Sequence, residues 1–239
     1  NNSSFISFFK QEVSNSSLKD STKRNHLSTL LLLQEFKRDI VFSDLTFEFV
    51  SSFEYFLQQK GYHTNTIAKH MKHLKRHINI AINKEYIEIQ KYAFRKYKIK
   101  TVENKHTHLV PEELEQLERL SLTGKYMKLQ KSLDAFLFCC YAGMRYSDFT
   151  NLSKKNIVDI TWLIYKSVKT GTEVRLPLYL LFAGKGIVIL NKYRNNLEVF
   201  FRLRDNSNIN KDLIIIAKLA GLSKKISFHT ARHTNATLL

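Results

Sequence analysis

Residues 156–178 read NIVDITWLIYKSVKTGTEVRLPL, and their composition differs from that of the rest of the chain. Val, Ile, Tyr and Trp dominate the stretch, and KTGTE places a glycine-containing turn between two apolar runs. This pattern predicts two or three strands with a hairpin around Gly171. The 239 residues include only 7 glycines and 2 prolines, which favours long helices elsewhere. We therefore expect a mainly α fold with one small antiparallel β-sheet.

The first hundred residues carry apolar residues at helical spacing and predict a compact four-helix domain. The predicted helices span residues 3–13, 17–38, 43–61 and 63–86. In the second helix, the leucines expected to face the core are Leu27, Leu30, Leu31 and Leu33. In the fourth helix, one apolar stripe follows the i, i+4, i+7, i+11 pattern and consists of Ile67, Met71, Leu74 and Ile78. Another face of that helix is basic, so it is a candidate binding element.

The basic charge of the chain is concentrated in one region. The formal net charge is +17; residues 60–105 carry 12 Lys and Arg against 3 Asp and Glu, whereas residues 1–59 carry 6 against 7. Such a concentration indicates a polyanion partner, with nucleic acid as the leading candidate. A solvated basic surface that only keeps the protein soluble is the alternative. The residues expected to contact DNA are Lys23, Arg24, Lys69, Lys72, His73, Arg76, Lys96 and Lys98.

The domain organisation follows from a break in periodicity after the fourth helix. We expect a helical DNA-binding domain over residues 1–90, a basic interdomain linker over 91–108, and a second domain over 109–239. In the second domain, helices are predicted at 109–120, 124–143, 179–196, 208–221 and 229–239, with a short helix or turn at 144–153.

Several classes of protein are disfavoured by the composition. No apolar run approaches the ~18 residues of a membrane span, so we expect no membrane association. The N-terminus lacks the basic and apolar regions of a secretory signal. Cys139 and Cys140 are adjacent in an apolar stretch and are interpreted as small buried residues of a reducing compartment, which predicts a cytoplasmic protein.

Two short stretches carry cations that can bind an anion. In YAGMRYSDF, residues 141–149, Arg145 follows a glycine at the end of an apolar helix, and Asp148 stands three residues further on. A structural Arg–Asp pair explains that stretch equally well if it is taken alone. In KSVKTGTE, residues 166–173, Lys169 comes at the tip of the predicted hairpin, where a lysine is most often simply solvated.

A third stretch, HTARHT, closes the chain at residues 229–234. On a helix, His229 shares a face with Arg232 at i+3 and with His233 at i+4. Two histidines at i and i+4 can bind zinc, but Thr230 replaces the Glu of the protease motif and no third ligand is apparent. No carboxylate cluster suggests a metal either. We therefore expect no metal ion and no other cofactor.

Taken together, the three stretches suit phosphoryl transfer. Two guanidiniums can hold the non-bridging oxygens of a phosphate bidentately. A lysine can protonate a departing alkoxide, and a histidine can act as acid, base or hydrogen-bond donor. A site with this set of cations, and no activated nucleophile among them, must obtain its nucleophile elsewhere.

The same stretches resemble the Arg, Lys and His-x-x-Arg boxes of the tyrosine recombinases, the phage-type integrase family, and occur in that family's order. The matching segments are AGMRYSDF, VKTGTEVRLPL and HTARHTNATLL. The intervals, 24 residues from Arg145 to Lys169 and 60 from Lys169 to His229, are compatible with the family. The helix NTIAKHMKHLKRHIN, residues 65–79, resembles one in the family's SAM-like core-binding domain. The likeness is closest to integrases of conjugative transposons and related mobile elements of Bacteroides-type bacteria, and it covers essentially the whole chain.

The resemblance implies a site-specific DNA recombinase of a mobile element. In this family a tyrosine attacks the scissile phosphate, forms a 3′-phosphotyrosine link and frees a 5′-hydroxyl. By motif match, Arg145 and Arg232 would clamp the phosphate, Lys169 would protonate the 5′-oxygen, and His229 would assist proton transfer, with Asp148 supporting the site. The implied partners are duplex DNA held in a C-shaped clamp, a homotetramer in the synaptic complex, and host DNA-bending and excision factors. The implied location is the bacterial cytoplasm, at the nucleoid when DNA is bound.

The chain also departs from the family pattern. The family's further His or Trp box and its nucleophilic Tyr come after the His-x-x-Arg helix, and neither occurs before Leu239. We therefore expect these 239 residues to bind DNA without forming a covalent adduct. Asn235 stands where an aromatic residue is expected. Two alternatives remain: an enzyme like the type IB topoisomerases, which share the Arg/Lys/His chemistry, and a non-catalytic DNA-binding or architectural module.

Overall fold

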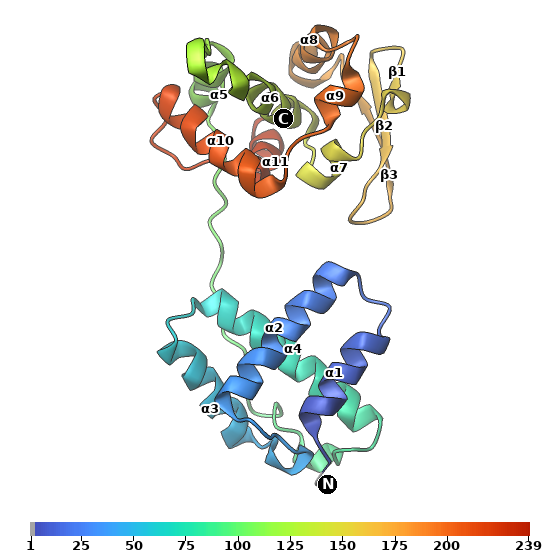
Figure 1. Cartoon of the computed structure of the whole chain (residues 1–239), viewed down its shortest axis with the longest axis vertical. Helices are drawn as coiled ribbons and strands as arrows, with labels where there is room; N and C mark the ends of the chain where they lie inside the picture. The colour runs from blue at the N-terminus through green and yellow to red at the C-terminus, as the bar shows by residue number, and fades with distance from the viewer. Residues whose placement is uncertain (1–2) are drawn as a thin grey trace. The chain divides into compact units, whose positions relative to one another are not determined.

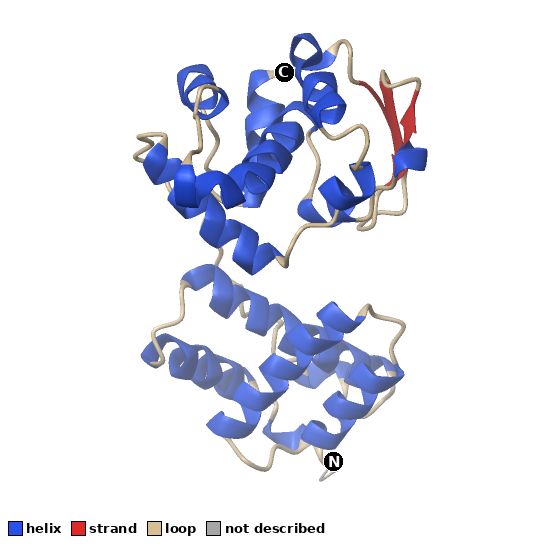
Figure 2. Cartoon of the chain, turned by 45° about the horizontal axis from the view of Figure 1, so that its top comes forward, coloured by secondary structure: helices blue, strands red, loops and turns tan. Residues whose placement is uncertain are grey.

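The computed structural model describes residues 3–239 and divides the chain into two compact units. The first unit extends to Asn104, and the second comprises Lys105–Leu239. Both are built mainly from helices, and the second also contains a three-stranded antiparallel sheet (Figures 1 and 2). The predicted class, mainly α with a small antiparallel sheet in a two-domain arrangement, is confirmed.

The first unit contains four α-helices among the described residues. They are α1 (Phe5–Asn15), α2 (Asp20–Phe36), α3 (Phe47–Gln59) and α4 (Thr64–Asn83), with short 3-10 turns η1 (Phe42–Asp44) and η2 (Ile89–Lys91). Two of the helices begin at a hydroxyl cap: Ser4 accepts a hydrogen bond from the Ser7 amide, and Thr46 accepts one from the Phe49 amide. The four helices predicted from the apolar periodicity are therefore present, with their ends shifted by a few residues.

The core of the first unit forms where the apolar faces of these helices meet. All four residues of the predicted α4 stripe, Ile67, Met71, Leu74 and Ile78, are buried. The prediction for α2 is wrong at one position, because Leu31 is 67% exposed whereas Leu32 is buried. Residue 31 lies about 100° around the helix from residues 30 and 32, so a run of four leucines cannot all face one core.

Residues 91–99 pack on the first unit, although the sequence suggested that a linker begins at residue 91. Ala93 and Phe94 are buried in the first core, and Tyr97 contacts both Phe47 and Phe94 through its ring. The half-buried Tyr97 and Ile99 alternate with exposed basic residues, so the segment uses one side for packing and leaves its charges in solvent. In the sequence, the many charged residues of this segment made its alternating apolar residues hard to recognise.

The second unit is a helical layer with a sheet at one side. Its helices are α5 (Pro111–Glu118), α6 (Gln130–Ala142), α7 (Tyr146–Thr150), α8 (Lys185–Lys192), α9 (Leu197–Phe201), α10 (Asn206–Leu219) and α11 (Phe228–Leu238). The 3-10 turns are η3 (Gly124–Leu129), η4 (Lys154–Asn156) and η5 (Leu181–Gly184). The short helix α9 was not predicted, and the first turn and a half of the helix expected over 124–143 is the 3-10 turn η3.

Helix α6 is the centre of the second unit. Every residue from Ser132 to Ala142 is buried, so no face of the helix is left for solvent. Helices α8, α10 and α11 pack around it, and α11 lies along it (Figure 1). A helix that is buried on all sides is typical of the middle of a domain, where its neighbours pack around it.

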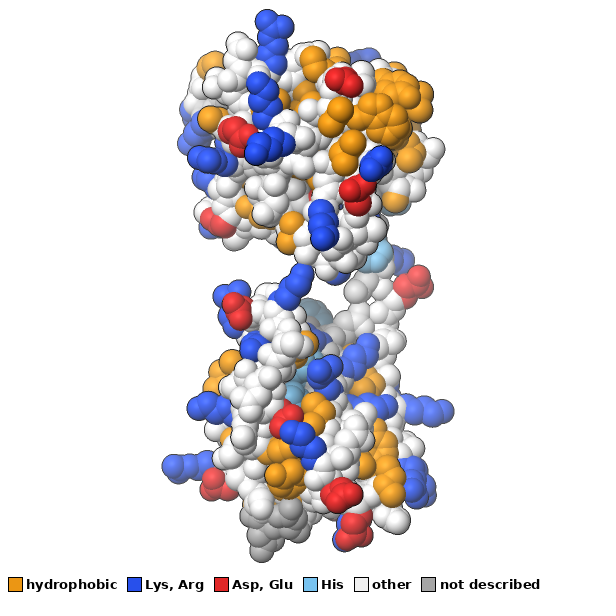
Figure 3. All heavy atoms as spheres, turned by 90° about the vertical axis from the view of Figure 1, so that its right-hand side faces the viewer, with side chains coloured by type: hydrophobic (Ala, Val, Ile, Leu, Met, Phe, Trp, Pro, Cys, Tyr) orange, Lys and Arg blue, Asp and Glu red, His pale blue; other side chains and the backbone are white. Residues whose placement is uncertain are grey.

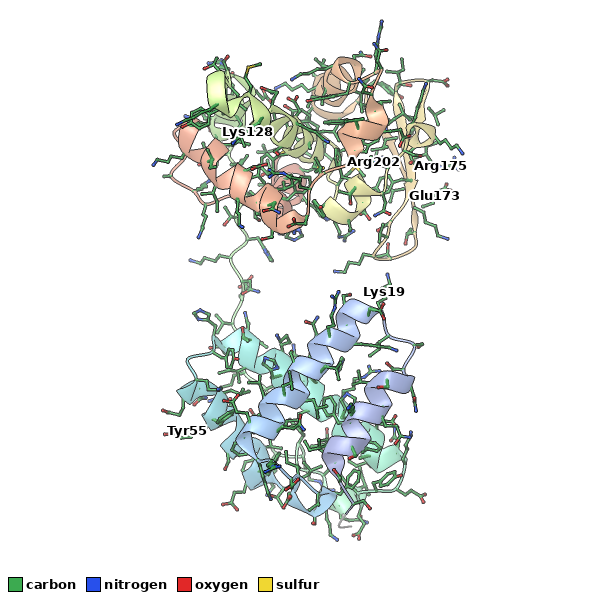
Figure 4. All side chains as sticks on the ribbon, in the orientation of Figure 1. Lys19, Tyr55, Lys128, Glu173, Arg175 and Arg202 are labelled. Carbon is green, nitrogen blue, oxygen red and sulfur yellow. The ribbon has the colours of Figure 1, made fainter. Side chains whose placement is uncertain are left out.

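The sheet joins β1 (Ile157–Val158), β2 (Trp162–Lys166) and β3 (Glu173–Pro177) in the order β1-β2-β3. Strand β2 alternates, with Leu163 and Tyr165 buried toward the helices. On β3, the exposed Glu173 and Arg175 point away from the helices (Figure 4) and form an ion pair at 2.7 Å. The loop between β2 and β3 projects beyond the sheet (Figure 1).

Among the residues 3–239, no helix is both long and apolar enough to cross a membrane.

Four histidines lie between α2 and α4 in the first unit. The Oγ1 atom of Thr29 is 2.8 Å from Nδ1 of His70 and 2.8 Å from Nδ1 of His73. His77 places its Nε2 3.2 Å from Nδ1 of His26, and the His26 ring stacks on that of His73 with centroids 4.0 Å apart. Histidine side chains are visible among lysines and arginines on this part of the surface (Figure 3).

The charge state of this histidine cluster depends on its burial. Burial lowers the pKa of His70 to about 4, and the nearby Lys69 adds to the effect. Burial, followed by the charges of His26 and other cations, lowers the pKa of His73 to about 4 and that of His77 to about 3. At neutral pH these rings are therefore uncharged in the folded protein.

Acid is expected to destabilise the first unit. Above about pH 6.5 the histidines are neutral in both states, so the cluster adds no pH dependence. Below it, the unfolded chain takes up protons that the folded cluster rejects, down to about pH 4. The free energy of unfolding therefore decreases as the pH is lowered, by at most ~1.4 kcal/mol per pH unit for each such histidine. Urea unfolding followed by circular dichroism at pH 7.5 and 5.5 measures this loss.

The single tryptophan, Trp162, lies in the second unit, so its fluorescence reports the unfolding of that unit. Comparison with the circular dichroism signal then distinguishes the unfolding of the first unit. The variant His77→Phe retains a ring against Phe9, with which His77 stacks at 3.6 Å, and is expected to reduce the pH slope. His63→Gln, at an exposed position before α4, is the matched control. Equal pH slopes in the two variants would show that the cluster does not control acid stability.

Candidate active site

The end of α6 and the turn after it hold Arg145. Gly143 ends the helix with a left-handed backbone, φ 63°, and Met144 is buried. Arg145 is then the extended residue that precedes α7. Its Nη1 lies 3.7 Å from Oδ2 of Asp148, and its side chain retains 26% of its exposure. The guanidinium is thus held at the edge of the core with part of its surface open.

Asp148 connects this turn to the hairpin. Its side chain is fully buried, and its Oδ1 accepts a hydrogen bond of 2.9 Å from the backbone amide of Val168. Its other oxygen has no hydrogen-bond partner among the described residues and faces the Arg145 guanidinium. One carboxylate therefore ties the Arg145 turn to the residue directly before Lys169.

Lys169 lies in the loop between β2 and β3, as predicted. Two backbone hydrogen bonds close this loop, from the Ser167 amide to the Thr172 carbonyl and from the Gly171 amide to the Ser167 carbonyl, each 2.8 Å. Gly171 takes the left-handed conformation that this turn requires, φ 73°. Lys169 itself is exposed and makes no hydrogen bond or ion pair within residues 3–239. Its ammonium is therefore available to an external anion.

Helix α11 brings His229 and Arg232 to the same place. Its buried Phe228, Ala231 and Thr234 anchor it in the core. Arg232 donates from Nη1 to the carbonyl oxygen of Gly143 at 2.7 Å. His229, one turn earlier on the helix, is exposed. Arg232 therefore reaches across to the turn that carries Arg145.

The charges around His229 affect its protonation. Burial lowers the pKa of His229, and the charges of Arg232, His106, Arg145 and Lys169 lower it further, in that order. The ring therefore favours the neutral form, which can either donate or accept a hydrogen bond. Contacts join the three segments that carry the predicted site residues: Arg232 bonds to Gly143 beside Arg145, Arg145 faces Asp148, and Asp148 bonds to Val168 beside Lys169, while His229 is on the same helix as Arg232.

One neighbour of the site was missed from the sequence. His106 lies in the predicted linker, but its ring stacks on that of His233 with centroids 4.2 Å apart and an interplanar angle of 16°. The His233 ring in turn meets His229 edge-on, with centroids 4.6 Å apart. A row of three imidazoles therefore borders the Arg145–Arg232 region. No short motif links residues 106 and 233, so only the fold reveals the contact.

In the first unit, most of the basic residues predicted to contact DNA are unpaired, whereas some other lysines form ion pairs. Lys60 and Lys84 form ion pairs with Glu35 and Glu12. Within the described part of the chain, no ion pair or hydrogen bond engages the side chains of Arg24, Lys69, Lys72, Arg76, Lys96 or Lys98, all of which are exposed. Unpaired cations on a surface remain free to bind an anion.

Lys69 and Lys72 also line a hollow of about 410 Å³ on α4. Its opposite wall is the segment 101–104, which Asn65 holds through hydrogen bonds to Val102 and Asn104. Positive side chains therefore border a concave surface on the face of α4 that the sequence predicts to bind DNA.

Two predicted DNA-contacting residues have side chains that other parts of the first unit hold, although His73 also lines the hollow. His73 is half-buried, and its ring is held by Thr29 and stacked on His26 between α2 and α4. Residues 70, 73 and 77 lie at helical spacing on one flank of α4, which faces α2. Lys23 is also half-buried and donates to the carbonyl oxygen of Ser14 at 3.0 Å.

Among residues 3–239, no group of three or more His, Cys, Asp and Glu side chains is arranged to hold a metal ion.

Comparison with protein families gives two matches that together span most of the chain. Residues 4–99 match the phage integrase SAM-like domain, and residues 107–239 match the phage integrase family. No curated protein matches the chain by sequence.

Solved structures with a similar fold include integrases. A lambda integrase tetramer bound to a Holliday junction aligns with a TM-score of 0.81 at 18% identity, covering 100% of this chain and 70% of that chain. A lambda integrase dimer bound to a COC′ core site aligns at 0.79 and 16% identity, with coverage of 100% and 70%. The Tn1549 transposon integrase in complex with circular intermediate DNA aligns at 0.75 and 16% identity, with coverage of 99% and 86%.

The buried Asp148 is expected to stabilise the second unit. Asp148→Ala removes the acceptor of the Val168 amide and the anion beside Arg145, and a buried group left without its partner is costly. The free energy of unfolding should fall by about 2 kcal/mol. Asp148→Asn keeps an oxygen for the amide and should lose less. Urea unfolding followed by the fluorescence of Trp162, which lies on β2, measures both changes.

Glu173→Ala is the matched control for the Asp148 variants, because Glu173 is an exposed, ion-paired carboxylate on the same hairpin. Its effect should be within about 0.5 kcal/mol. If Asp148→Ala is as mild as this control, Asp148 does not tie the hairpin to the Arg145 turn.

Proposed function

The chain belongs to the phage integrase family, the site-specific tyrosine recombinases, and we propose that Arg145, Lys169, His229 and Arg232 form the site that binds the scissile phosphate of duplex DNA. The observation that carries this proposal is the set of contacts that joins the three segments: Arg232 donates to the Gly143 carbonyl beside Arg145, and the buried Asp148 contacts both the Arg145 guanidinium and the Val168 amide beside Lys169. No core-packing role requires three cations from three separate segments at one point.

In this proposal the two arginines bind the non-bridging oxygens of the phosphate. Arg232 is oriented by its hydrogen bond to the Gly143 carbonyl, and Arg145 by Asp148. Each guanidinium has five N–H donors, so donors remain for the phosphate after these contacts. Charge that develops on the phosphate oxygens in the transition state meets donors that are already oriented, and the reorganisation cost is small.

Lys169 and His229 would move the protons. When the bond to the 5′-oxygen breaks, the leaving alkoxide needs a proton, and the exposed Lys169 ammonium can supply it. A neutral His229 can accept a proton from an attacking hydroxyl or donate a hydrogen bond to the phosphate. Asp148 would act as a positioning residue, because its buried carboxylate contacts both the Arg145 guanidinium and the backbone beside Lys169.

The first unit would hold the DNA duplex through its unpaired cations. We propose that Lys69, Lys72 and Arg76 on α4 contact phosphates, with Arg24, Lys96 and Lys98 adding to the same positive surface. The half-buried His73 and Lys23 are better suited to supporting α2 and α4 than to contacting DNA. The basic residues within the predicted linker, 91–108, would follow the phosphate backbone of the bound duplex.

We further propose that the protein acts on the ends of a mobile element in the bacterial cytoplasm, as a homotetramer assembled on DNA. One similar structure is a tetramer on a Holliday junction and others are transposon integrases bound to transposon DNA, which supports this assignment. Host DNA-bending and excision factors would shape the DNA. A type IB topoisomerase-like enzyme and a non-catalytic module are less favoured, because both units match recombinase domains.

The tyrosines near the site have other roles. Tyr165 experiences the charges of Arg232 and Arg145, but burial raises its pKa to about 12 and keeps the phenol protonated. The hydroxyls of Tyr141, Tyr146 and Tyr193 donate to Glu118, the Arg204 carbonyl and Asp134. We therefore propose that none of these tyrosines forms the phosphotyrosine link.

Binding to DNA should weaken steeply with salt, because each neutralised phosphate releases condensed counterions. The double variant Lys72→Ala, Arg76→Ala should bind more weakly and should make the plot of log affinity against log salt shallower by about 2. Fluorescence anisotropy of a labelled duplex over a range of salt concentrations measures both quantities.

The double variant Lys60→Ala, Lys84→Ala removes the same charge from two ion-paired lysines of the same unit. Its salt slope should stay close to that of the unchanged chain. Identical slopes for the two double variants would mean that only net charge matters and that α4 is not the DNA-contacting face.

A duplex that traps covalent intermediates tests the nucleophile. The 239-residue chain should bind this suicide substrate without forming a covalent adduct, measured by denaturing electrophoresis. An adduct formed by the unchanged chain, and lost in Tyr165→Phe, would contradict the proposed structural role of Tyr165. An adduct retained in Tyr165→Phe would show that another tyrosine of the chain is the nucleophile.

A further inference from the structure

The last carbonyl groups of α6 are bound by side chains of α11. The Nδ2 atom of Asn235 donates to the carbonyl oxygens of Cys140 and Tyr141, at 2.9 and 3.0 Å. Arg232 donates to the Gly143 carbonyl, two residues beyond Tyr141, at 2.7 Å. Helices ordinarily satisfy such carbonyls with the backbone amides that follow the helix. In the described structure no backbone hydrogen bond returns from Gly143 or Met144 to α6.

Gly143 and Asn235 fit one another closely. A Cβ atom placed on Gly143 would lie 2.5 Å from Oδ1 and 3.1 Å from Cγ of Asn235. The carboxamide therefore fills the space that a side chain at residue 143 would need. The left-handed backbone at Gly143, φ 63°, independently favours glycine. A phenylalanine at position 235 would have no donor for these carbonyls, so the asparagine makes a contact that such a residue lacks.

This contact lies close to the phosphate site along the chain. Arg145 follows Gly143 by two residues, and the buried Met144 between them fixes the direction of the turn. Asn235 is on the same helix as His229 and Arg232. A single carboxamide therefore connects the segment that carries one arginine to the helix that carries the other arginine and the histidine.

We propose that Asn235 is a positioning residue that sets Arg145 relative to Arg232 and His229 through the end of α6. This inference rests on the proposed function, since it concerns the same phosphate site. It assigns to Asn235 no contact with DNA. Its effect on phosphate binding is exerted through the Gly143 turn and therefore through Arg145.

A double-mutant cycle with Arg145 tests the proposal. Inorganic phosphate is titrated into the 239-residue chain, and the His229 ring resonance reports binding by NMR. Arg145→Ala should weaken phosphate binding by roughly tenfold, as expected for one charge-assisted contact. Asn235→Ala should weaken it nearly as much, and the double variant no more than Arg145→Ala alone. If the two losses multiply, Asn235 does not act through Arg145 and the proposal is overturned.

The pH titration of His229 gives a readout that a purely structural role of Asn235 would leave unchanged. Arg145 is one of the charges that lower the pKa of His229. If Asn235→Ala lets Arg145 move away, the His229 midpoint should rise. An unchanged midpoint together with unchanged phosphate binding would overturn the proposal, even if the variant is less stable.

Matched variants separate positioning from folding. Asn235→Gln keeps a carboxamide donor and should restore part of the phosphate affinity that Asn235→Ala loses. Thr237→Ala changes the same helix at an exposed hydroxyl that bonds only to the His233 carbonyl of its own helix, and should have no effect. The fluorescence of Trp162 verifies that each variant folds. If Asn235→Ala does not fold, Asn235→Gln and Asn235→Ser take its place in the cycle.

The two proposals fail in different ways. If Arg145→Ala itself leaves phosphate binding unchanged, the proposed phosphate site is wrong. If Arg145→Ala weakens binding and the Asn235 variants do not, the phosphate site stands and the positioning role alone is wrong.

Discussion

A helix that is buried on every side needs protein groups to satisfy most of its terminal carbonyls. In the second unit that helix is α6, and its C-terminal carbonyls are bound by Asn235 and Arg232 of α11. Helix α11 is thereby fixed in position along α6. Arg145 lies in the turn that follows α6, and His229 lies on α11, the helix that caps α6. The capping of α6 therefore also brings Arg145 and His229 into one region.

The cations of the chain fall into two groups with different consequences. Lysines such as Lys60, Lys84 and Lys185 lie beside glutamates and contribute little beyond local surface stability. Those on the exposed side of α4, and Lys169 on the hairpin, have no anionic neighbour within the described residues. Their mutual repulsion is unfavourable in the free protein and is relieved when a polyanion binds. Net charge alone would not have distinguished the two groups.

Most of the architecture was predictable because periodicity is a local property. The four helices of the first unit and the hairpin around Gly171 follow from apolar spacing and turn residues, and the grouping of Arg145, Lys169, His229 and Arg232 follows from the family resemblance. Long-range contacts were not predictable. The stacking of His106 on His233 and the capping of α6 by Asn235 join residues that no pattern links. The short helix α9 and the packing of residues 91–99 were hidden because charged neighbours mask a few apolar residues.

The contact of Thr29 with two imidazoles limits where protons can be in the first unit. A hydroxyl has one hydrogen, yet Oγ1 faces Nδ1 of both His70 and His73 at 2.8 Å. If the hydroxyl donates to one ring, the other ring must donate to it, so at least one histidine carries its hydrogen on Nδ1. The ring tautomers of His70 and His73 are therefore coupled through a single side chain. In the layer beneath the basic face of α4, His70 and His73 therefore cannot both carry their hydrogens on Nε2 while each keeps its hydrogen bond to Thr29.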